Sequence, residues 1–288
     1  MDTQGAAGAL RVRFSTWDEF NVARHWKIPA DRRSFAPLRT IWIAARQPMF
    51  LAALVILLGL WGFAEIADSL GEDAVQQFDE MVLKSLRQPD ALDKLIGPPW
   101  VEQSLRDLTA LGGVTVLTMV TFIVCIYLWI DGEWKLSLFA FFAVASGTIL
   151  TFALKDVFDR PRPQLVPHIL VSVSSYSFPS GHAMASAIVY LTLGAMLTES
   201  QPRWRIKAYV MAVALLLTFS IGTTRVFLGV HYPTDVLAGW AGGFAWAYAC
   251  RVLSRLGTMA VHFRHLGNWR GGSRGTSNPD GNVDRHAT

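Results

Sequence analysis

A histidine and an aspartate four residues apart stand out in a sequence that is otherwise strongly apolar. His231 precedes Asp235, and Pro233 between them suits the first turn of a helix. A carboxylate in reach of an imidazole can bond one ring nitrogen and fix the tautomer, which leaves the other nitrogen free to attack. These residues predict nucleophilic chemistry by His231. Taken alone, Asp235 could instead interact with a helix dipole, and His231 could be an ordinary interfacial histidine.

A second histidine, His182, follows a short polar segment and begins another apolar run. Ser180 is a natural N-cap residue, and Gly181 has no side chain to keep a ligand away from the backbone. The first N–H groups of a helix have no partners within the helix, so this segment predicts an anion site that faces His182. The alternative is an ordinary capped helix with an interfacial histidine.

Three basic residues, Lys155, Arg162 and Arg225, lie in successive connections between apolar runs. The planar fork of Arg162 matches phosphate oxygens, while Lys155 acts as a point charge. Considered alone, Lys155 and Arg162 could instead snorkel to lipid head groups at a helix end. Together with two histidines, a carboxylate and the hydroxyl of Thr224, they provide what phosphoryl transfer needs: a nucleophile, an acid, and cations for the phosphoryl oxygens.

Other polar residues near these segments carry no functional prediction. We interpret Arg160 and Asp159, in the spacer between Lys155 and Arg162, as a local surface pair. We interpret His168 as an ordinary loop histidine.

The elements that position these residues are six apolar runs. The chain has 288 residues, of which 52% are hydrophobic and 17% charged, and this balance indicates lipid as the solvent for much of it. Because spans without barrel-like alternation must be helices, we predict an all-α polytopic membrane protein with six transmembrane helices. The fourth run is the shortest and is rich in small residues, so we expect it to pack inside the bundle. The runs cover residues 49–67, 110–130, 136–154, 183–198, 206–223 and 235–253.

Basic residues are distributed unequally between the two sides of the predicted bundle. Eight lie in residues 1–48, one is Lys135, three lie in 203–207 and six follow from Arg251 onward, whereas the other side holds eight. The positive-inside rule then places both termini in the cytoplasm of an inner or plasma membrane protein, with the polar segments on the extracytoplasmic side. No block of like charge is dense enough to predict a nucleic-acid partner.

This topology predicts three regions. Residues 1–48 form a cytoplasmic N-terminal segment, 49–254 a membrane domain, and 255–288 a cytoplasmic, largely disordered tail, with disorder expected from residue 267. The connection 68–109 faces the extracytoplasmic side. It is either an amphipathic helix at the interface or a soluble cap over the site.

The polar segments, taken in order, resemble the signature of the type 2 phosphatidic acid phosphatase family, called PAP2. That signature is Lys, six residues, Arg-Pro; then Pro-Ser-Gly-His; then Ser-Arg, five residues, His, three residues, Asp. Thr224 stands where the family usually has Ser, which retains the hydroxyl. The matching residues are Lys155, Arg162, Pro163, Pro179, Ser180, Gly181, His182, Arg225, His231 and Asp235.

The resemblance implies a PAP2-type helical bundle and a lipid phosphate phosphatase that uses neither a metal nor another cofactor. It implies that His231 forms a phosphohistidine, that Asp235 orients His231, and that His182 protonates the leaving oxygen and then activates water. It also implies a set of groups that bind the phosphoryl oxygens, namely Lys155, Arg162, Ser180, Gly181, Thr224 and Arg225.

The sequence leaves the substrate and the oligomeric state open. Candidate substrates are undecaprenyl diphosphate, phosphatidic acid, diacylglycerol diphosphate, phosphatidylglycerol phosphate and lipid A phosphate, presented by the lipid bilayer. A non-enzymatic lipid-phosphate binder or transporter on the same fold is an alternative, although both histidines and Asp235 are present. Vanadium haloperoxidases resemble the same site but are soluble, which six apolar runs disfavour.

Overall fold

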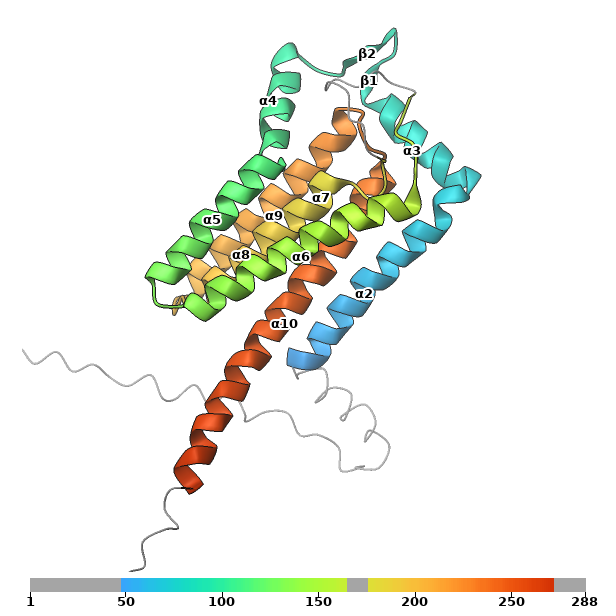
Figure 1. Cartoon of the computed structure of the whole chain (residues 1–288). Coiled ribbons are helices and arrows are strands. Elements are labelled where there is room, and N and C mark those ends of the chain that lie inside the picture. Colours follow the sequence, from blue (N-terminus) through green and yellow to red (C-terminus); the bar gives the residue numbers. More distant parts are fainter. Residues whose placement is uncertain (1–47, 165–175, 272–288) are drawn as a thin grey trace, which may run out of the picture. The chain divides into compact units, whose positions relative to one another are not determined.

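The computed structural model describes residues 48–164 and 176–271, and this part of the chain is a bundle of helices (Figure 1). The predicted N-terminal segment and His168 lie outside the described residues. The order of elements is α2 (Pro48–Asp68), η1 (Ser69–Gly71), α3 (Asp73–Ser85), β1 (Arg87–Gln88), β2 (Ala91–Leu95), α4 (Pro99–Ala110), α5 (Val114–Ile130), α6 (Trp134–Phe158), α7 (Gly181–Ser186), η2 (Ala187–Leu191), α8 (Thr192–Glu199), α9 (Trp204–Phe227) and α10 (Pro233–Gly271). The predicted all-α class is confirmed.

Each of the six apolar runs lies within a helical segment. α2, α5, α6, α9 and α10 contain the first, second, third, fifth and sixth runs nearly in full. The fourth run forms the continuous segment α7–η2–α8. As expected, this segment is the most enclosed: 78% of its most apolar window is buried, against 33% in α6 and α9.

The number of membrane spans remains a prediction. Among the described residues, four helical segments are long and apolar enough to cross a membrane, and five if α4 and α5, bent by 49°, form one span. The four are Ala52–Gly71, Trp134–Phe158, Gly181–Glu199 and Trp204–Phe227. α10 is not among them. The helices establish an integral membrane protein, but the count of six is not confirmed.

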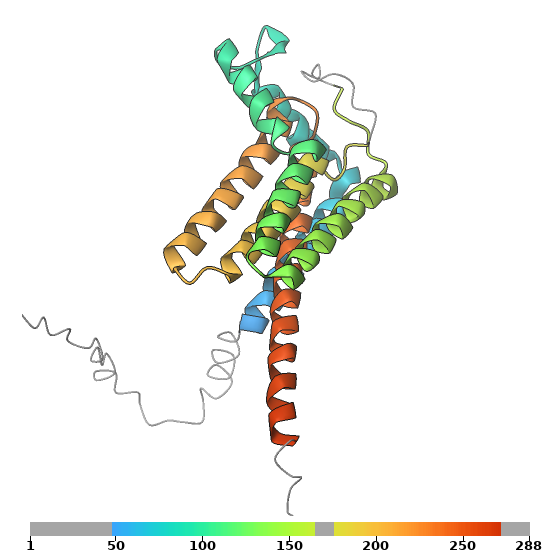
Figure 2. The ribbon, with the colours of Figure 1, turned by 60° about the vertical axis from the view of Figure 1, so that its left-hand side comes forward.

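The connection 68–109, which we call the cap, consists of several short elements, and whether it lies at the membrane interface stays a prediction. It contains η1, α3, the antiparallel pair β1–β2 and α4, and it lies at the end of the bundle where α6 and α9 finish (Figures 1 and 2). Leu83 of α3 is fully buried against Val226 of α9 and Val236 of α10. This burial of apolar surface attaches the cap to the bundle.

The helices around the fourth segment pack closely through glycine. A Cβ atom on Gly243 of α10 would lie 2.5 Å from the Cβ of Ala187 and 3.0 Å from the carbonyl oxygen of Met184. Only glycine allows α10 to approach η2 at this distance. The packing fixes the start of α10, which carries Asp235.

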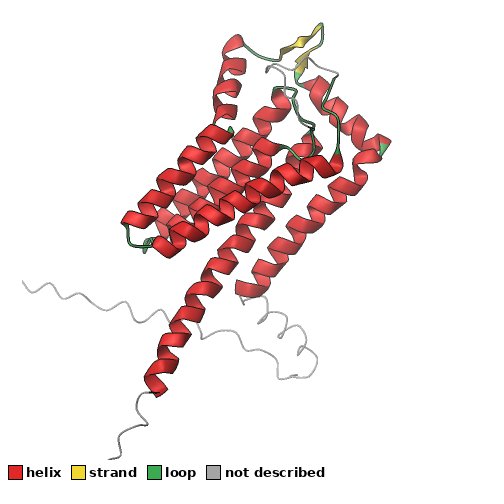
Figure 3. Cartoon of the chain, viewed as in Figure 1, coloured by secondary structure: helices red, strands yellow, loops and turns green. Residues whose placement is uncertain are grey.

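Helix content accounts for almost all regular structure, and α10 is longer than predicted (Figure 3). α10 continues past residue 254, our predicted boundary of the membrane domain, to Gly271. The helix thus extends into the stretch from residue 267 for which we expected disorder, and the predicted domain boundaries stay a prediction. Residues 272–288 lie outside the described part of the chain.

Candidate active site

Four helix ends meet beneath the cap and bring the three motif segments together (Figure 1). Lys155 lies in the last turn of α6, Gly181 begins α7, and Arg225 lies in the last turn of α9. Asp235 lies in the first turn of α10. Residues that are distant in sequence therefore occupy one small volume at the same end of the bundle.

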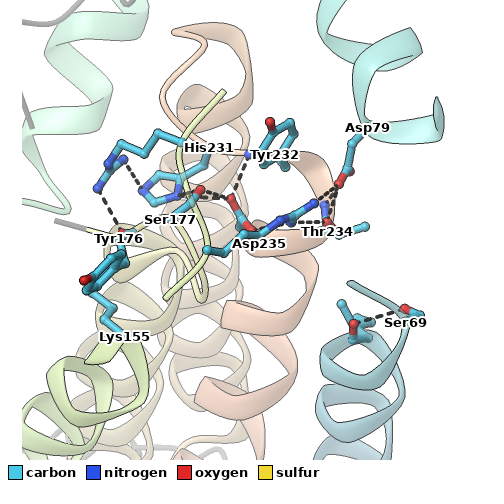
Figure 4. Close-up of polar contacts among 12 residues, drawn as sticks. Ser69, Asp79, Lys155, Tyr176, Ser177, His231, Tyr232, Thr234 and Asp235 are labelled. Atoms are coloured by element: carbon cyan, nitrogen blue, oxygen red, sulfur yellow. Dashed lines mark hydrogen bonds and ion pairs between the residues drawn. The ribbon is translucent and has the colours of Figure 1, made fainter. Parts of the chain in front are cut away.

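His231 and Asp235 form a buried pair, as their spacing predicts (Figure 4). The Nδ1 atom of His231 lies 3.4 Å from Oδ2 of Asp235, and the two side chains are 2% and 0% exposed. Oδ2 also accepts the backbone N–H of Tyr232 at 2.9 Å and the hydroxyl of Ser177. These donors hold the carboxylate against the imidazole.

The hydrogen bonds of His231 determine which nitrogen carries the proton. Nη1 of Arg162 lies 3.1 Å from Nε2 of His231. A guanidinium can only donate, so Nε2 must accept and Nδ1 must carry the hydrogen that faces Asp235. Nε2 is thus the nitrogen with a lone pair, as a nucleophilic imidazole requires.

The surroundings of His231 keep its ring neutral. Burial lowers the pKa of His231 to about 3 and outweighs Asp235, which raises it, while Arg162 and Arg225 lower it further. The neutral ring is the form that a nucleophilic imidazole requires.

The three predicted cations lie around His231 and His182. Nζ of Lys155 donates to the carbonyl oxygen of Tyr176 at 2.8 Å, and a Cβ on Gly181 would lie 3.2 Å from Cε of Lys155. Nη1 of Arg225 donates to Oγ1 of Thr109 on α4 at 2.9 Å. Two of the cations, Lys155 and Arg225, are buried and Arg162 is half-buried. Such burial is unfavourable without an anion, which fits a site for phosphate.

A cavity of about 410 Å³ joins these polar groups to an apolar wall formed by α5 and α6. α5 and α6 supply most of its wall, including Phe122 and Phe152, which are 51% and 55% exposed on the bundle surface. Six predicted site residues line its polar end, namely Lys155, Arg162, Gly181, His182, Arg225 and His231. The cavity has a charged end for a phosphate and an apolar end for a hydrocarbon chain.

Two predicted hydroxyl groups behave differently from expectation. Ser180 is at the N-cap position of α7, but its side chain makes no capping bond. Its Oγ is buried and has no hydrogen-bond partner among the described residues, while its backbone N–H donates to the carbonyl oxygen of Asp235 at 3.0 Å. Oγ1 of Thr224 donates to the carbonyl oxygen of Ile221 at 2.6 Å. A phosphate contact by Thr224 stays a prediction and requires that this bond break.

The sequence patterns missed three polar residues near the His231–Asp235 pair, namely Asp79, Arg160 and Ser177. Arg160 is no surface partner of Asp159: it is 10% exposed and forms ion pairs with Asp79 at 2.9 Å and Asp235 at 2.7 Å. Burial opposes its charge, but the two carboxylates hold the pKa of Arg160 above its usual value. Ser177 bonds Asp235 directly. The only sequence feature that could have indicated a role for Arg160 is its position between the motif cations Lys155 and Arg162.

Known proteins with similar sequences and structures point to the same class of enzyme as the geometry of the site. Residues 136–257 match the model of the PAP2 superfamily. The chain is 31% identical to phosphatidylglycerophosphatase B of Bacillus subtilis over 182 residues, which cover 63% of this chain and 85% of that protein. The chain belongs to the PAP2 superfamily. This PAP2 protein also shares its fold with the crystal structure of a transmembrane PAP2 type phosphatidylglycerolphosphate phosphatase from Bacillus subtilis, with a TM-score of 0.63 and 29% identity over 69% of this chain and 96% of that chain.

A further relative is the undecaprenyl-diphosphatase of Sulfolobus acidocaldarius, which is 39% identical over 105 residues, or 35% of this chain and 45% of that protein. This PAP2 protein is accordingly a membrane phosphatase that acts on lipid phosphates.

Proposed function

We propose that this PAP2 protein hydrolyses a lipid phosphomonoester or diphosphate through a phosphohistidine at His231. The observation that carries the proposal is the cavity, which joins the Nε2 side of His231 and three cations to an apolar wall between α5 and α6. A lipid phosphate has the same two parts, a charged head and a hydrocarbon chain.

The reaction begins when the phosphoryl oxygens bind Lys155, Arg162 and Arg225. Arg162 exchanges its bond to His231 for bonds to phosphate, which frees the Nε2 lone pair. Nε2 attacks phosphorus in line, and the bond from phosphorus to the leaving oxygen breaks; this is the ester oxygen of a monophosphate or the bridging oxygen of a diphosphate. Protonated His182 gives its proton to that oxygen. Asp235 stabilises the positive imidazole through the Nδ1 proton.

Hydrolysis of the intermediate reverses the role of His182. It accepts a proton from water as the water oxygen attacks phosphorus, and the N–P bond breaks to release inorganic phosphate. The backbone N–H of Gly181 and the hydroxyls of Ser180 and Thr224 assist the cations in both steps. The cations neutralise the phosphoryl charge, so the proposed reaction needs no metal ion.

The site faces the extracytoplasmic side of the membrane, with both termini in the cytoplasm. Charge bias supports this arrangement: the cap and the motif segments share the end of the bundle that carries fewer Lys and Arg residues.

The charged end and the apolar wall of the cavity support lipids with a terminal phosphate or diphosphate as substrates. The relatives named above act, by their names, on phosphatidylglycerophosphate and undecaprenyl diphosphate. The other candidates are phosphatidic acid, diacylglycerol diphosphate and lipid A phosphate. A panel of these lipids, compared by kcat/KM, separates monophosphate from diphosphate preference.

The test of the proposal is phosphate release by purified protein in detergent with EDTA present. We expect turnover with EDTA and its loss in His231→Ala and His231→Gln, with Lys84→Ala, an exposed cation of α3, unchanged. Turnover that needs Mg²⁺ would refute metal independence. Undiminished turnover in both His231 variants would refute the phosphohistidine, and binding without hydrolysis by the wild type would favour the lipid-binding alternative.

A further inference from the structure

Behind the His231–Asp235 pair lies a second buried ionic group that belongs to none of the three motifs (Figure 4). Asp79 of α3 is fully buried, and its Oδ2 lies 2.9 Å from Nη2 of Arg160. Nη1 of Arg160 lies 2.7 Å from Oδ1 of Asp235. One guanidinium therefore bridges the cap and the carboxylate that faces His231.

Further contacts restrict the position of the Arg160 guanidinium. Its Nη1 also donates to Oγ1 of Thr234 at 2.9 Å, and its guanidinium carbon lies 4.2 Å from the ring centre of Tyr232. A planar guanidinium that forks between two carboxylates and stacks on a ring has little freedom to rotate.

Asp79 is equally constrained. Its Oδ1 accepts the backbone N–H of Thr234 at 3.1 Å, and its Oδ2 accepts the Thr234 hydroxyl at 2.6 Å in addition to Arg160. These bonds attach α3 to the first turn of α10, the turn that carries Asp235.

The two oxygens of Asp235 consequently have separate partners. Oδ1 faces Arg160, whereas Oδ2 faces His231, Ser177 and the N–H of Tyr232. The carboxylate cannot rotate about its Cβ–Cγ bond without breaking the bond to Arg160. The bridge thereby keeps one oxygen of Asp235 directed at Nδ1 of His231.

We propose that Asp79 and Arg160 are positioning residues for the His231–Asp235 pair, so that the cap helix α3 is part of the catalytic apparatus. The inference rests on the proposed role of His231 as nucleophile. Arg160 also balances two buried carboxylates, and removal of either partner leaves an uncompensated buried charge. Asp79 acts through Arg160 and does not line the cavity.

Asp79→Asn and Arg160→Lys test this in the full-length protein in detergent. Each keeps a polar group of similar size but loses the fork between two carboxylates. We expect kcat to fall about 10- to 100-fold, as for other supporting hydrogen-bond partners, while KM for the lipid stays within about 2-fold because the phosphate-binding cations are untouched. The matched control is Glu80→Gln on the same helix, whose partly exposed side chain pairs with Lys84 at 3.3 Å. Its kcat should equal that of the wild type.

A second measurement separates positioning from a purely structural role, since Asp79 also stabilises the start of α10. Rapid-quench labelling should show slower phosphoenzyme formation in the folded variants, and added guanidinium should restore part of the rate in Arg160→Ala. If either Asp79→Asn or Arg160→Lys does not fold, the kinetics of the other variant test the positioning role. A kcat loss that only matches the loss of folded protein, or a rise in KM with unchanged kcat, overturns the inference.

Failure of the inference is distinguishable from failure of the proposed function. Turnover that survives in His231→Ala and His231→Gln refutes the proposed mechanism itself. Inactive His231 variants together with wild-type rates in Asp79→Asn and Arg160→Lys refute only the positioning role.

Discussion

His231 is held at both of its ring nitrogens, by Asp235 at Nδ1 and by Arg162 at Nε2. The second contact has a consequence for the reaction, because the same guanidinium blocks the nucleophile and is suited to bind phosphate. Substrate binding and release of the nucleophile are therefore one event in the proposed mechanism. In that mechanism Arg162 occupies Nε2 of His231 until a phosphate replaces the contact.

The pH dependence of the first step follows from the lowered pKa of His231. Attack needs the neutral ring, which is lost only when the pH falls through its pKa, and burial moves that pKa to about 3. We expect phosphoenzyme formation from an aryl phosphate, whose leaving group needs no proton, to lack an acid limb near ~6.5, the usual imidazole value. Rapid-quench rates between pH 5 and 8 check this. A limb at the usual value would contradict a buried, neutral His231.

Ser177 offers a test of the contacts around Asp235. Its buried hydroxyl donates to Oδ2, and loss of a bond to a charged acceptor costs about 1.5–3 kcal/mol. We expect Ser177→Ala to lower kcat by about 10- to 100-fold with little change in KM. Ser85→Ala, whose exposed hydroxyl bonds the carbonyl oxygen of Val82, is the control. Equal kinetics for the two variants would show that Ser177 does not support the pair.

The motif residues could be predicted from the sequence because the residues within each motif lie close together along the chain. His231 and Asp235 lie one helical turn apart, so their pairing is readable. Arg160 and Asp235 are 75 residues apart, and Asp79 and Thr234 are 155 apart. Such bonds depend on how α3 docks on α10, which no local pattern encodes. The same reason explains why Arg160 was taken for a surface residue.

At the scale of the element, apolar length predicted the helices but not the cap. Runs of apolar residues in lipid must be helical, and the six predicted runs each lie in a helix. The cap is different: α3, α4 and the β1–β2 pair are short, mixed in polarity and stabilised by contacts with α9 and α10. The end of α10 was misjudged because Gly and polar residues beyond 254 continue the helix instead of ending it.

Close packing of α10 on η2 gives a prediction for stability. Gly243→Ala places a methyl group 2.5 Å from the Cβ of Ala187, so backbone must shift at a cost of about 1–3 kcal/mol, more than the helix propensity gained. Thermal unfolding in detergent should show a lower Tm. Gly62→Ala on α2, with nothing within 4 Å of the added carbon, is the matched control. An unchanged Tm for Gly243→Ala would contradict the close approach of the two helices.

At the scale of the whole molecule, the bundle places all three motifs and the cap at one end (Figures 1 and 2). We infer the side of the membrane that the site faces from the charge bias of the connections. The proposed direction suits an enzyme that removes phosphate from lipids of the outer leaflet.

Labelling of single cysteines tests the orientation. With Cys125 and Cys250 replaced by Ala, we expect a membrane-impermeant maleimide to label Asp93→Cys of β2 in intact cells. Lys135→Cys, in the first turn of α6 at the opposite end, should react only after the membrane is opened. Both positions are exposed on the protein, so each variant serves as the control for the other. The reverse pattern would place the site in the cytoplasm.

The most direct test of the account is to trap the phosphoenzyme. Protein incubated briefly with a lipid whose terminal phosphate carries ³²P, then denatured and digested, should yield one labelled peptide containing His231. The label should be stable in alkali and lost in acid, as for a phosphohistidine, and should be absent from His231→Gln. A label stable in acid, a label on another residue, or full turnover with no labelled protein after rapid quench would contradict the account.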